Sequence, residues 1–356
     1  MEHAKVGPRF PIVGNLALLC ATLLLCLVLL EAALIPLVPP PILWRYPQET
    51  YVPDADLMHR LTPNQATFTH SAPVRTNSYG LRDFDFARTP AKNTFRILCL
   101  GDSLTFGNGV TAEATYPKQL EKLLNGSAGA RRFEVINAGV PAYDTWQEIT
   151  YLEKYGIEFR PQLVIVGVYA NDVVPKPKVI PRSVGESGSL KRVGWKALVS
   201  DEVAYLLKRS RSLLFLGDRV GKVLNLLQPS NQYNHKEAML LGRPDPFVEE
   251  GWRQVEASLR QLDWLGKSHG FQSLIVVFPM QDQIVAHYGT EGYQTRLKKI
   301  VENIGLPLVD LMPAFYAAAQ QGEPLFIAWD GHPNPRAYGI AAAEIRHKLD
   351  AIGTLP

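Results

Sequence analysis

The sequence predicts an α/β fold, in which a parallel sheet lies between two layers of helices, preceded by a single transmembrane helix. Three observations lead to this prediction. From about residue 93 to the C-terminus, short apolar runs alternate with segments of helical apolar spacing, a pattern typical of a parallel sheet with helices on both faces. Gly, Asp, Asn and Ser follow several of these runs, where buried strands would end. A long apolar segment lies close to the N-terminus.

The composition is that of a globular protein with enough apolar material for a sizeable core. Of the 356 residues, 46% are hydrophobic and 20% are charged. The 37 basic and 34 acidic residues leave a net charge of only +3 and form no lysine or arginine block, which does not favour a nucleic-acid partner. Two of the three cysteines lie in the N-terminal apolar segment and Cys99 lies in an apolar run, so we expect no disulfide framework.

The N-terminal apolar segment, Pro11–Val38, predicts a membrane anchor. Residues 12–30 alone are long enough to cross about 30 Å of hydrocarbon as a helix. Lys5 and Arg9 precede the segment and acidic residues follow it, which predicts a cytoplasmic N-terminus at residues 1–10 and an extracytoplasmic remainder, periplasmic in a Gram-negative bacterium. The alternative is a cleaved signal peptide, but its apolar run should span only ~7–15 residues and end in a small-x-small site.

Residues 39–92 predict a linker or apron that leads to the α/β domain at residues 93–356. Three consecutive prolines at 39–41 end the anchor, because proline cannot continue a helix. The first half of the domain is expected to contain strands at Phe95–Leu100, Phe133–Gly139 and Leu163–Tyr169, separated by helices at Tyr116–Gly126 and Thr145–Gly156.

A proline- and charge-rich stretch then interrupts the alternation and predicts an insertion near residues 175–245. Within it, Val203–Leu227 is expected to form one or two basic amphipathic helices. Such an insertion can be a surface elaboration, a lid over a site, or a contact with the membrane surface. After it we expect helices near 247–268, 293–305 and 336–349, with strands at Ser273–Phe278 and Leu306–Leu311.

Polar residues at the predicted strand ends indicate one site. Ser103 follows the first strand, Gly139 ends the second, and Asn171 follows the third, while Asp330 and His332 precede the last helix. Ligands of parallel α/β sheets bind at the carboxyl ends of the strands. A serine beside a histidine, an acid and hydrogen-bond donors can attack an acyl group.

The order of these motifs resembles the GDSL family of serine hydrolases, also called SGNH hydrolases. GDSLTFG at 101–107 matches the serine block and NAGV at 137–140 the glycine block, while YANDV at 169–173 matches the asparagine block and DGHPN at 330–334 the histidine block. The resemblance implies a three-layer, flavodoxin-like α/β/α fold. The anchor, the apron and the insertion lie outside it.

The resemblance also implies a role for each matched residue. Ser103 would be the nucleophile and His332 the base that takes its proton, with Asp330 orienting the imidazole. The backbone N–H groups of Ser103 and Gly139 and the side-chain amide of Asn171 would bind the oxyanion.

The acid of this triad has an alternative. Only Gly331 separates Asp330 from His332, whereas the family often has two residues there, so Asp310 at the end of the last strand is the second candidate acid. Ser103 can also be a plain helix N-cap. The remaining histidines, His70 among them, lie in no comparable context.

The implied activity is that of a serine ester hydrolase, which acts on acyl esters of a lipid or an acylated glycan through an acyl-enzyme. One alternative is an O-acyltransferase or deacetylase that modifies a cell-surface polysaccharide. Another is a catalytically silent carbohydrate- or lipid-binding domain. The sequence lacks G-x-S-x-G, H-E-x-x-H, C-x-x-C and a phosphate loop, so we expect neither a metal nor a cofactor.

Overall fold

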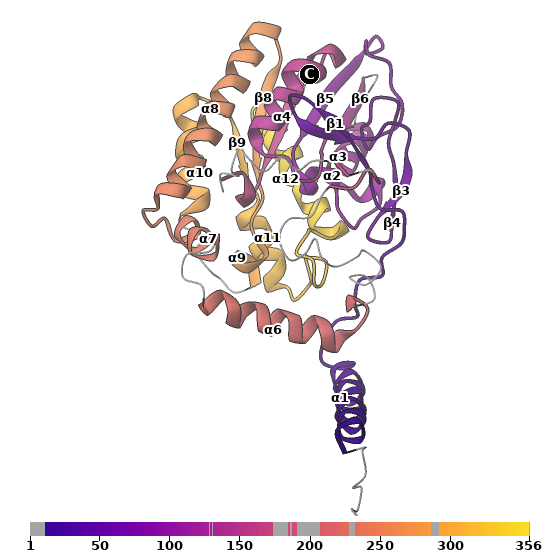
Figure 1. Ribbon diagram of the computed structural model, residues 1–356. Coiled ribbons are helices and arrows are strands. Elements are labelled where there is room, and N and C mark those ends of the chain that lie inside the picture. The colour runs from indigo at the N-terminus through magenta and orange to yellow at the C-terminus, as the bar shows by residue number, and fades with distance from the viewer. Residues whose placement is uncertain are drawn as a thin grey trace, which may run out of the picture. The chain divides into compact units, whose positions relative to one another are not determined.

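The computed structural model describes residues 11–127, 129, 131–173, 184–185, 187–190, 207–227, 232–285 and 292–355, and the chain forms two compact units. The first unit contains α1 (Pro11–Leu34) and α6 (Arg211–Leu227), and the second contains the central sheet and the remaining elements (Figure 1).

The second unit is built on a five-stranded parallel sheet. Its strands are β5 (Thr94–Leu100), β6 (Arg132–Asn137), β7 (Leu163–Val168), β8 (Gln272–Val277) and β9 (Leu308–Asp310). They lie in the order β6-β5-β7-β8-β9, which is the flavodoxin-like order. The chain turns to one side of β5 to form β6 and to the other side to form β7, so the topological switch point lies between the carboxyl ends of β5 and β7. The predicted α/β fold is confirmed.

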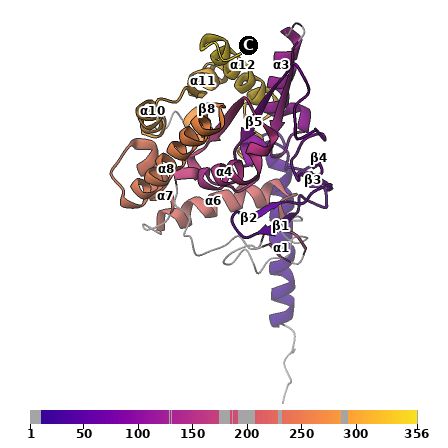
Figure 2. The same ribbon diagram turned by 90° about the horizontal axis from the view of Figure 1, so that it is seen from above.

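Helices cover both faces of the sheet because successive strand residues point to opposite sides. Ile97 and Cys99 of β5 belong to one buried cluster, with α3 (Tyr116–Ser127), α11 (Met312–Gln320) and α12 (Pro335–Ala351). Leu98 and Leu100 belong to the other, with α4 (Thr145–Tyr151), α8 (Pro246–His269) and α10 (Tyr293–Ile304). Figure 2 shows α3 and α12 on one side of the sheet and α4 and α8 on the other.

Several elements differ from the expectation. The helix predicted to reach Gly156 leaves α-helical geometry after Tyr151 and continues as a π-helical turn, Leu152–Gly156. Among the described residues, the helices α7 (Gln232–Leu241), α9 (Gln281–Val285) and α11 were not predicted. Of the insertion, α6 and α7 are described as helices, whereas residues 174–183 and 191–206 lie outside the described part of the chain.

The segment expected as a linker or apron packs into the second unit. It forms two antiparallel hairpins, β1 (Tyr51–Asp54) with β2 (Met58–Leu61) and β3 (Ala66–Thr69) with β4 (Ala72–Arg75). Leu57, Leu61, Val74 and Leu81 of this segment are buried in the same core cluster as β7. The segment therefore contributes to the core of the α/β unit.

The first unit joins an apolar helix to an amphipathic one. An 18-residue stretch of α1 within Val13–Leu34 has a mean hydropathy of 2.6, and none of that stretch is buried. The helix is long and apolar enough to span a membrane, as anchors and signal sequences both are. The Glu31 carboxylate accepts hydrogen bonds from the backbone N–H groups of Arg211 and Ser212, each at 2.9 Å. Glu31 thus satisfies donors at the start of α6.

Candidate functional site

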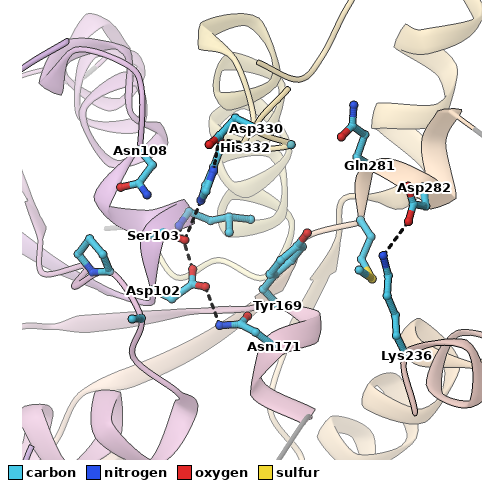
Figure 3. A pocket seen from close by; sticks show the side chains of 15 residues that line it. Asp102, Ser103, Asn108, Tyr169, Asn171, Lys236, Gln281, Asp282, Asp330 and His332 are labelled. Carbon is cyan, nitrogen blue, oxygen red and sulfur yellow. Dashed lines mark hydrogen bonds and ion pairs between the residues drawn. The ribbon is translucent and has the colours of Figure 1, made fainter. Parts of the chain in front are cut away.

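A cavity of about 500 Å³ opens at the switch point, within the second unit. Its lining comes from the segments after β5, β6, β7 and β8, from α7, and from the residues before α12 (Figure 3). Four of the five residues singled out from the sequence, Ser103, Asn171, Asp330 and His332, line this cavity, although 227 sequence positions separate Ser103 from Asp330.

Ser103 begins the short helix α2 (Ser103–Phe106) directly after β5, and its side chain faces the cavity. The N-cap of α2 is Asp102, whose Oδ1 accepts a hydrogen bond from the N–H of Leu104 at 2.8 Å. The interpretation of Ser103 as a plain N-cap is therefore wrong, because Asp102 holds that position. The Ser103 hydroxyl instead lies 2.9 Å from Nε2 of His332.

Asp330 is the carboxylate beside His332. Its Oδ1 accepts a short hydrogen bond from Nδ1 of His332 and a second, of 3.2 Å, from the His332 N–H. Gly331 between them has a left-handed φ of +87°, a conformation that glycine adopts without steric cost. The tight turn brings both side chains together despite the one-residue spacing. Asp310 instead accepts a hydrogen bond from the N–H of Met312 at 2.9 Å, at the start of α11.

The acid and the histidine shift one another's pKa. Burial would raise the pKa of the Asp330 carboxyl, but hydrogen bonds from His332 and His70 lower it well below its usual range. Burial would lower the pKa of His332, whereas the hydrogen bond and the charge of Asp330 raise it above its ordinary value of 6.5. The pair therefore favours a charged carboxylate that stabilises the protonated form of the imidazole.

Asn171 is held beside Ser103 by the acid that caps α2. The Nδ2 of Asn171 donates a 3.0 Å hydrogen bond to Oδ2 of Asp102, and Figure 3 shows this pair next to Ser103. The amide carries a second hydrogen on the same nitrogen. Asp172, the next residue, accepts hydrogen bonds from the N–H groups of Thr145 and Tyr169, both at 2.8 Å. These contacts fix the loop that carries Asn171.

Gly139 is not among the residues that line the cavity, and its expected role as an oxyanion donor stays a prediction. Its N–H donates to Oδ1 of Asn137 at 3.1 Å. A Cβ at this position would lie 2.2 Å from the backbone nitrogen of Phe106, so glycine permits the close approach of the loop to α2. Pro141 and Ala142 of the same loop line the cavity instead.

Two further groups at the site were missed by sequence reasoning. His70, in the turn between β3 and β4, has its Nε2 3.2 Å from Oδ2 of Asp330. Lys236 of α7 and Asp282 of α9 form a 2.7 Å ion pair in the cavity wall (Figure 3). Neither His70 nor the Lys236–Asp282 pair lies in a recognisable short motif, so the sequence does not indicate that they belong to the site. Within the described ranges, no group of three or more His, Cys, Asp or Glu side chains could hold a metal ion.

Comparison with known proteins identifies a family by sequence. The model of the GDSL-like lipase/acylhydrolase family matches residues 99–340, and no curated protein sequence matches significantly. Among solved structures, a two-domain esterase active on acetylated mannans aligns at 13% identity and a TM-score of 0.44. That alignment covers 74% of this chain and 51% of the esterase, so the chain spans about half of its length.

Two other solved structures align over most of their own length. TesA aligns at 14% identity and a TM-score of 0.41, over 72% of this chain and 99% of TesA. A mutant of Axe2, an acetylxylan esterase from Geobacillus stearothermophilus, aligns at 18% identity and a TM-score of 0.43, over 72% of this chain and 94% of Axe2. The family assignment rests on the sequence match.

Proposed function

The chain belongs to the GDSL-like lipase/acylhydrolase family and is therefore an ester-bond hydrolase, and we propose that it cleaves acyl esters with Ser103 as the nucleophile. The observation that carries this proposal is the chain of hydrogen bonds from Ser103 through His332 to Asp330. A serine hydroxyl is a poor nucleophile unless a neighbouring base takes its proton, and Nε2 of His332 is within reach to do so.

The reaction proceeds in two halves. Ser103 Oγ attacks the ester carbonyl while His332 accepts the hydroxyl proton, and His332 then returns a proton to the departing alcohol oxygen. The result is an acyl-enzyme on Ser103. Water, deprotonated by His332, releases the acid and restores the serine. Asp330 keeps the proton of the neutral imidazole on Nδ1, so that Nε2 is free to accept one.

The oxyanion is bound by the Ser103 N–H, the second amide hydrogen of Asn171 and a backbone donor on the loop after β6. The backbone N–H of Gly139, which donates to Oδ1 of Asn137 in the structure, is the donor that the family resemblance implies. Preorganised donors of this kind each contribute about 100- to 1000-fold in rate.

The cavity wall supports an acylated glycan as the substrate class. The Lys236–Asp282 ion pair and the amide of Gln281 line the cavity and can hydrogen-bond to hydroxyl groups on the alcohol side of an ester. The same feature supports the alternative of O-acyl transfer to a sugar hydroxyl, since transfer and hydrolysis share one acyl-enzyme. Product analysis with and without added oligosaccharide separates the two reactions.

The catalytic unit belongs on the extracytoplasmic side of a membrane, with α1 as an uncleaved single-pass anchor. Lys5 and Arg9 before the apolar helix favour a cytoplasmic N-terminus. The hydrogen bonds between Glu31 and the start of α6 also favour retention, because cleavage after α1 would remove them. External protease, added to cells with any outer barrier opened, should degrade the catalytic unit; protection would contradict this topology.

The nucleophile is tested with Ser103→Ala in the full-length protein, purified in detergent and assayed with p-nitrophenyl acetate. We expect hydrolysis to fall by at least about 1000-fold with the thermal unfolding temperature unchanged. Ser268→Ala on the exposed surface of α8 is the matched control and should keep full activity. Hydrolysis by Ser103→Ala at the rate of the control would refute the assignment.

A further inference from the structure

We propose that His70 is a positioning residue of the active site, which orients Asp330 and lowers the basicity of His332. This inference rests on the proposed function of Ser103, His332 and Asp330. The two oxygens of the Asp330 carboxylate each bind one histidine: Nδ1 of His332 lies against Oδ1 and Nε2 of His70 lies 3.2 Å from Oδ2. His70 lies outside the residues that the family model matches.

The surroundings of His70 decide which ring nitrogen carries its proton. The ring is buried, and its Nδ1 has no hydrogen-bond partner among the described residues. An unpaired buried N–H costs about 1–3 kcal/mol, so the proton of the neutral ring belongs on Nε2, where the carboxylate accepts it. His70 is thus a donor to Asp330.

The backbone of His70 is held in an uncommon conformation. Its φ is +53°, in the left-handed region that non-glycine residues rarely adopt. The His70 N–H donates to Oε1 of Gln48 at 3.0 Å, and its carbonyl accepts from the N–H of Arg45 at 2.8 Å. The ring packs edge-on against Trp44, with centroids 4.5 Å apart. Conformations of this kind persist where the surrounding structure determines them, and they are concentrated at functional sites.

The turn that carries His70 is also attached to the nucleophile segment. Oγ1 of Thr69 accepts a hydrogen bond from the N–H of Gly109 at 3.3 Å, in the loop that follows α2. The buried guanidinium of Arg82 donates to the carbonyls of Phe106 and Gly107 at 2.8 and 2.7 Å. The segment before the family domain therefore holds both the loop after Ser103 and the carboxylate beside His332.

Two consequences for turnover follow from this geometry. A donor on Oδ2 prevents rotation of the carboxylate, which keeps Oδ1 toward His332. The donor also offsets part of the negative charge of Asp330. Loss of this donor leaves more negative charge beside His332, which stabilises the protonated imidazole and raises the pKa of His332. Asp330, Asp102 and Glu49 are the acidic groups that act on His332, and Asp330 and Glu49 act on His70. A change at His70 leaves Asp102 in place and removes one of the interactions that lower the pKa of Glu49.

The test compares His70→Leu, which lacks a donor, with His70→Gln, whose amide nitrogen can reach the same oxygen. For His70→Leu we expect kcat to fall about 10- to 100-fold, the cost of a misplaced catalytic group, with KM nearly unchanged. The acidic limb of the kcat/KM profile should move to higher pH. His70→Gln should restore most of kcat and return the limb toward the wild-type position.

Val74→Ala is the control for a purely structural effect, because Val74 is buried in the same hairpin and its apolar side chain cannot donate a hydrogen bond to Asp330. It should lower the unfolding temperature and leave the acidic limb in place. If His70→Leu keeps wild-type kcat and pH profile, or if Val74→Ala shifts both equally, the proposal is overturned. If His70→Leu does not fold, His70→Asn replaces it; equal kcat for His70→Asn and His70→Gln then refutes the proposal, because the shorter amide cannot reach Oδ2.

These outcomes are distinct from failure of the proposed function. An active Ser103→Ala enzyme refutes the nucleophile whatever the His70 variants do. An inactive Ser103→Ala enzyme, together with unaltered His70 variants, leaves the nucleophile in place and removes only the role of His70.

Discussion

Replacement of Asp330 by asparagine should reverse the proton arrangement of His332. His70 needs an acceptor at the Oδ2 position, 3.2 Å from its Nε2, so the oxygen of the introduced amide turns toward His70. The amide NH2 then faces Nδ1 of His332, which has to become an acceptor. The imidazole proton therefore moves to Nε2, 2.9 Å from Ser103 Oγ, where it prevents His332 from taking the hydroxyl proton.

The expected loss in kcat for Asp330→Asn is about 10⁴-fold, the magnitude known for the same tautomer change in serine proteases. This corresponds to about 5.5 kcal/mol in the activation barrier. The assay is steady-state hydrolysis of p-nitrophenyl acetate at a pH above the acidic limb. Asp310→Asn is the matched control, because Asp310 accepts a hydrogen bond from Met312 and no contact with His332 is observed; its kcat should stay within about threefold.

A double variant tests whether His70 sets the orientation of the introduced amide. With His70→Leu present, the introduced amide at position 330 is free to rotate and can again offer its oxygen to Nδ1 of His332. Asp330→Asn combined with His70→Leu should therefore be more active than Asp330→Asn alone, whereas independent effects would multiply. An Asp330→Asn enzyme within tenfold of wild type would refute the triad and leave a Ser–His dyad.

The remaining predictions concern pH and the oxyanion donors. His332 must be neutral to act as a base, and its pKa is raised. We therefore expect kcat/KM to be maximal at high pH and to fall as the pH drops through a value above 6.5. A pH–rate profile with its acidic limb below 6.5 would contradict this. Asn171→Ala should lower kcat about 100- to 1000-fold through loss of an oxyanion donor, measured by the same ester assay. Gly139→Ala should act mainly on folding, because its Cβ would lie 2.2 Å from the Phe106 nitrogen. A variant with an unchanged unfolding temperature would contradict this.

The fold could be predicted because each strand and each long helix has a recognisable pattern within a short stretch of sequence. A buried parallel strand such as β5 needs a continuous apolar run, and Phe95–Leu100 is visible as one in the sequence. In the helices α3, α8, α10 and α12, apolar residues recur at the spacing that places them on one buried face of the helix. The helices α7, α9 and α11 were not predicted, since short helices have too few turns for a clear period.

The residues with motif context, Ser103 and His332, were also predictable, and the structure brings them within hydrogen-bond distance. The choice between Asp330 and Asp310 was not, because sequence spacing does not fix where a side chain points. The left-handed turn at Gly331 folds Asp330 onto His332, and this contact supports Asp330 as the proposed acid.

Local sequence patterns are thus sufficient to predict the sheet, the apolar N-terminal helix and the serine and histidine proposed to carry the reaction. The partners of those residues depend on the folded chain. Asp102 rather than Ser103 caps α2, Asn137 takes the Gly139 N–H, and His70 reaches Asp330 from a hairpin 260 positions earlier in the chain. Such contacts join segments that are distant in sequence, and only the packing of the hairpins onto the α/β unit brings them together.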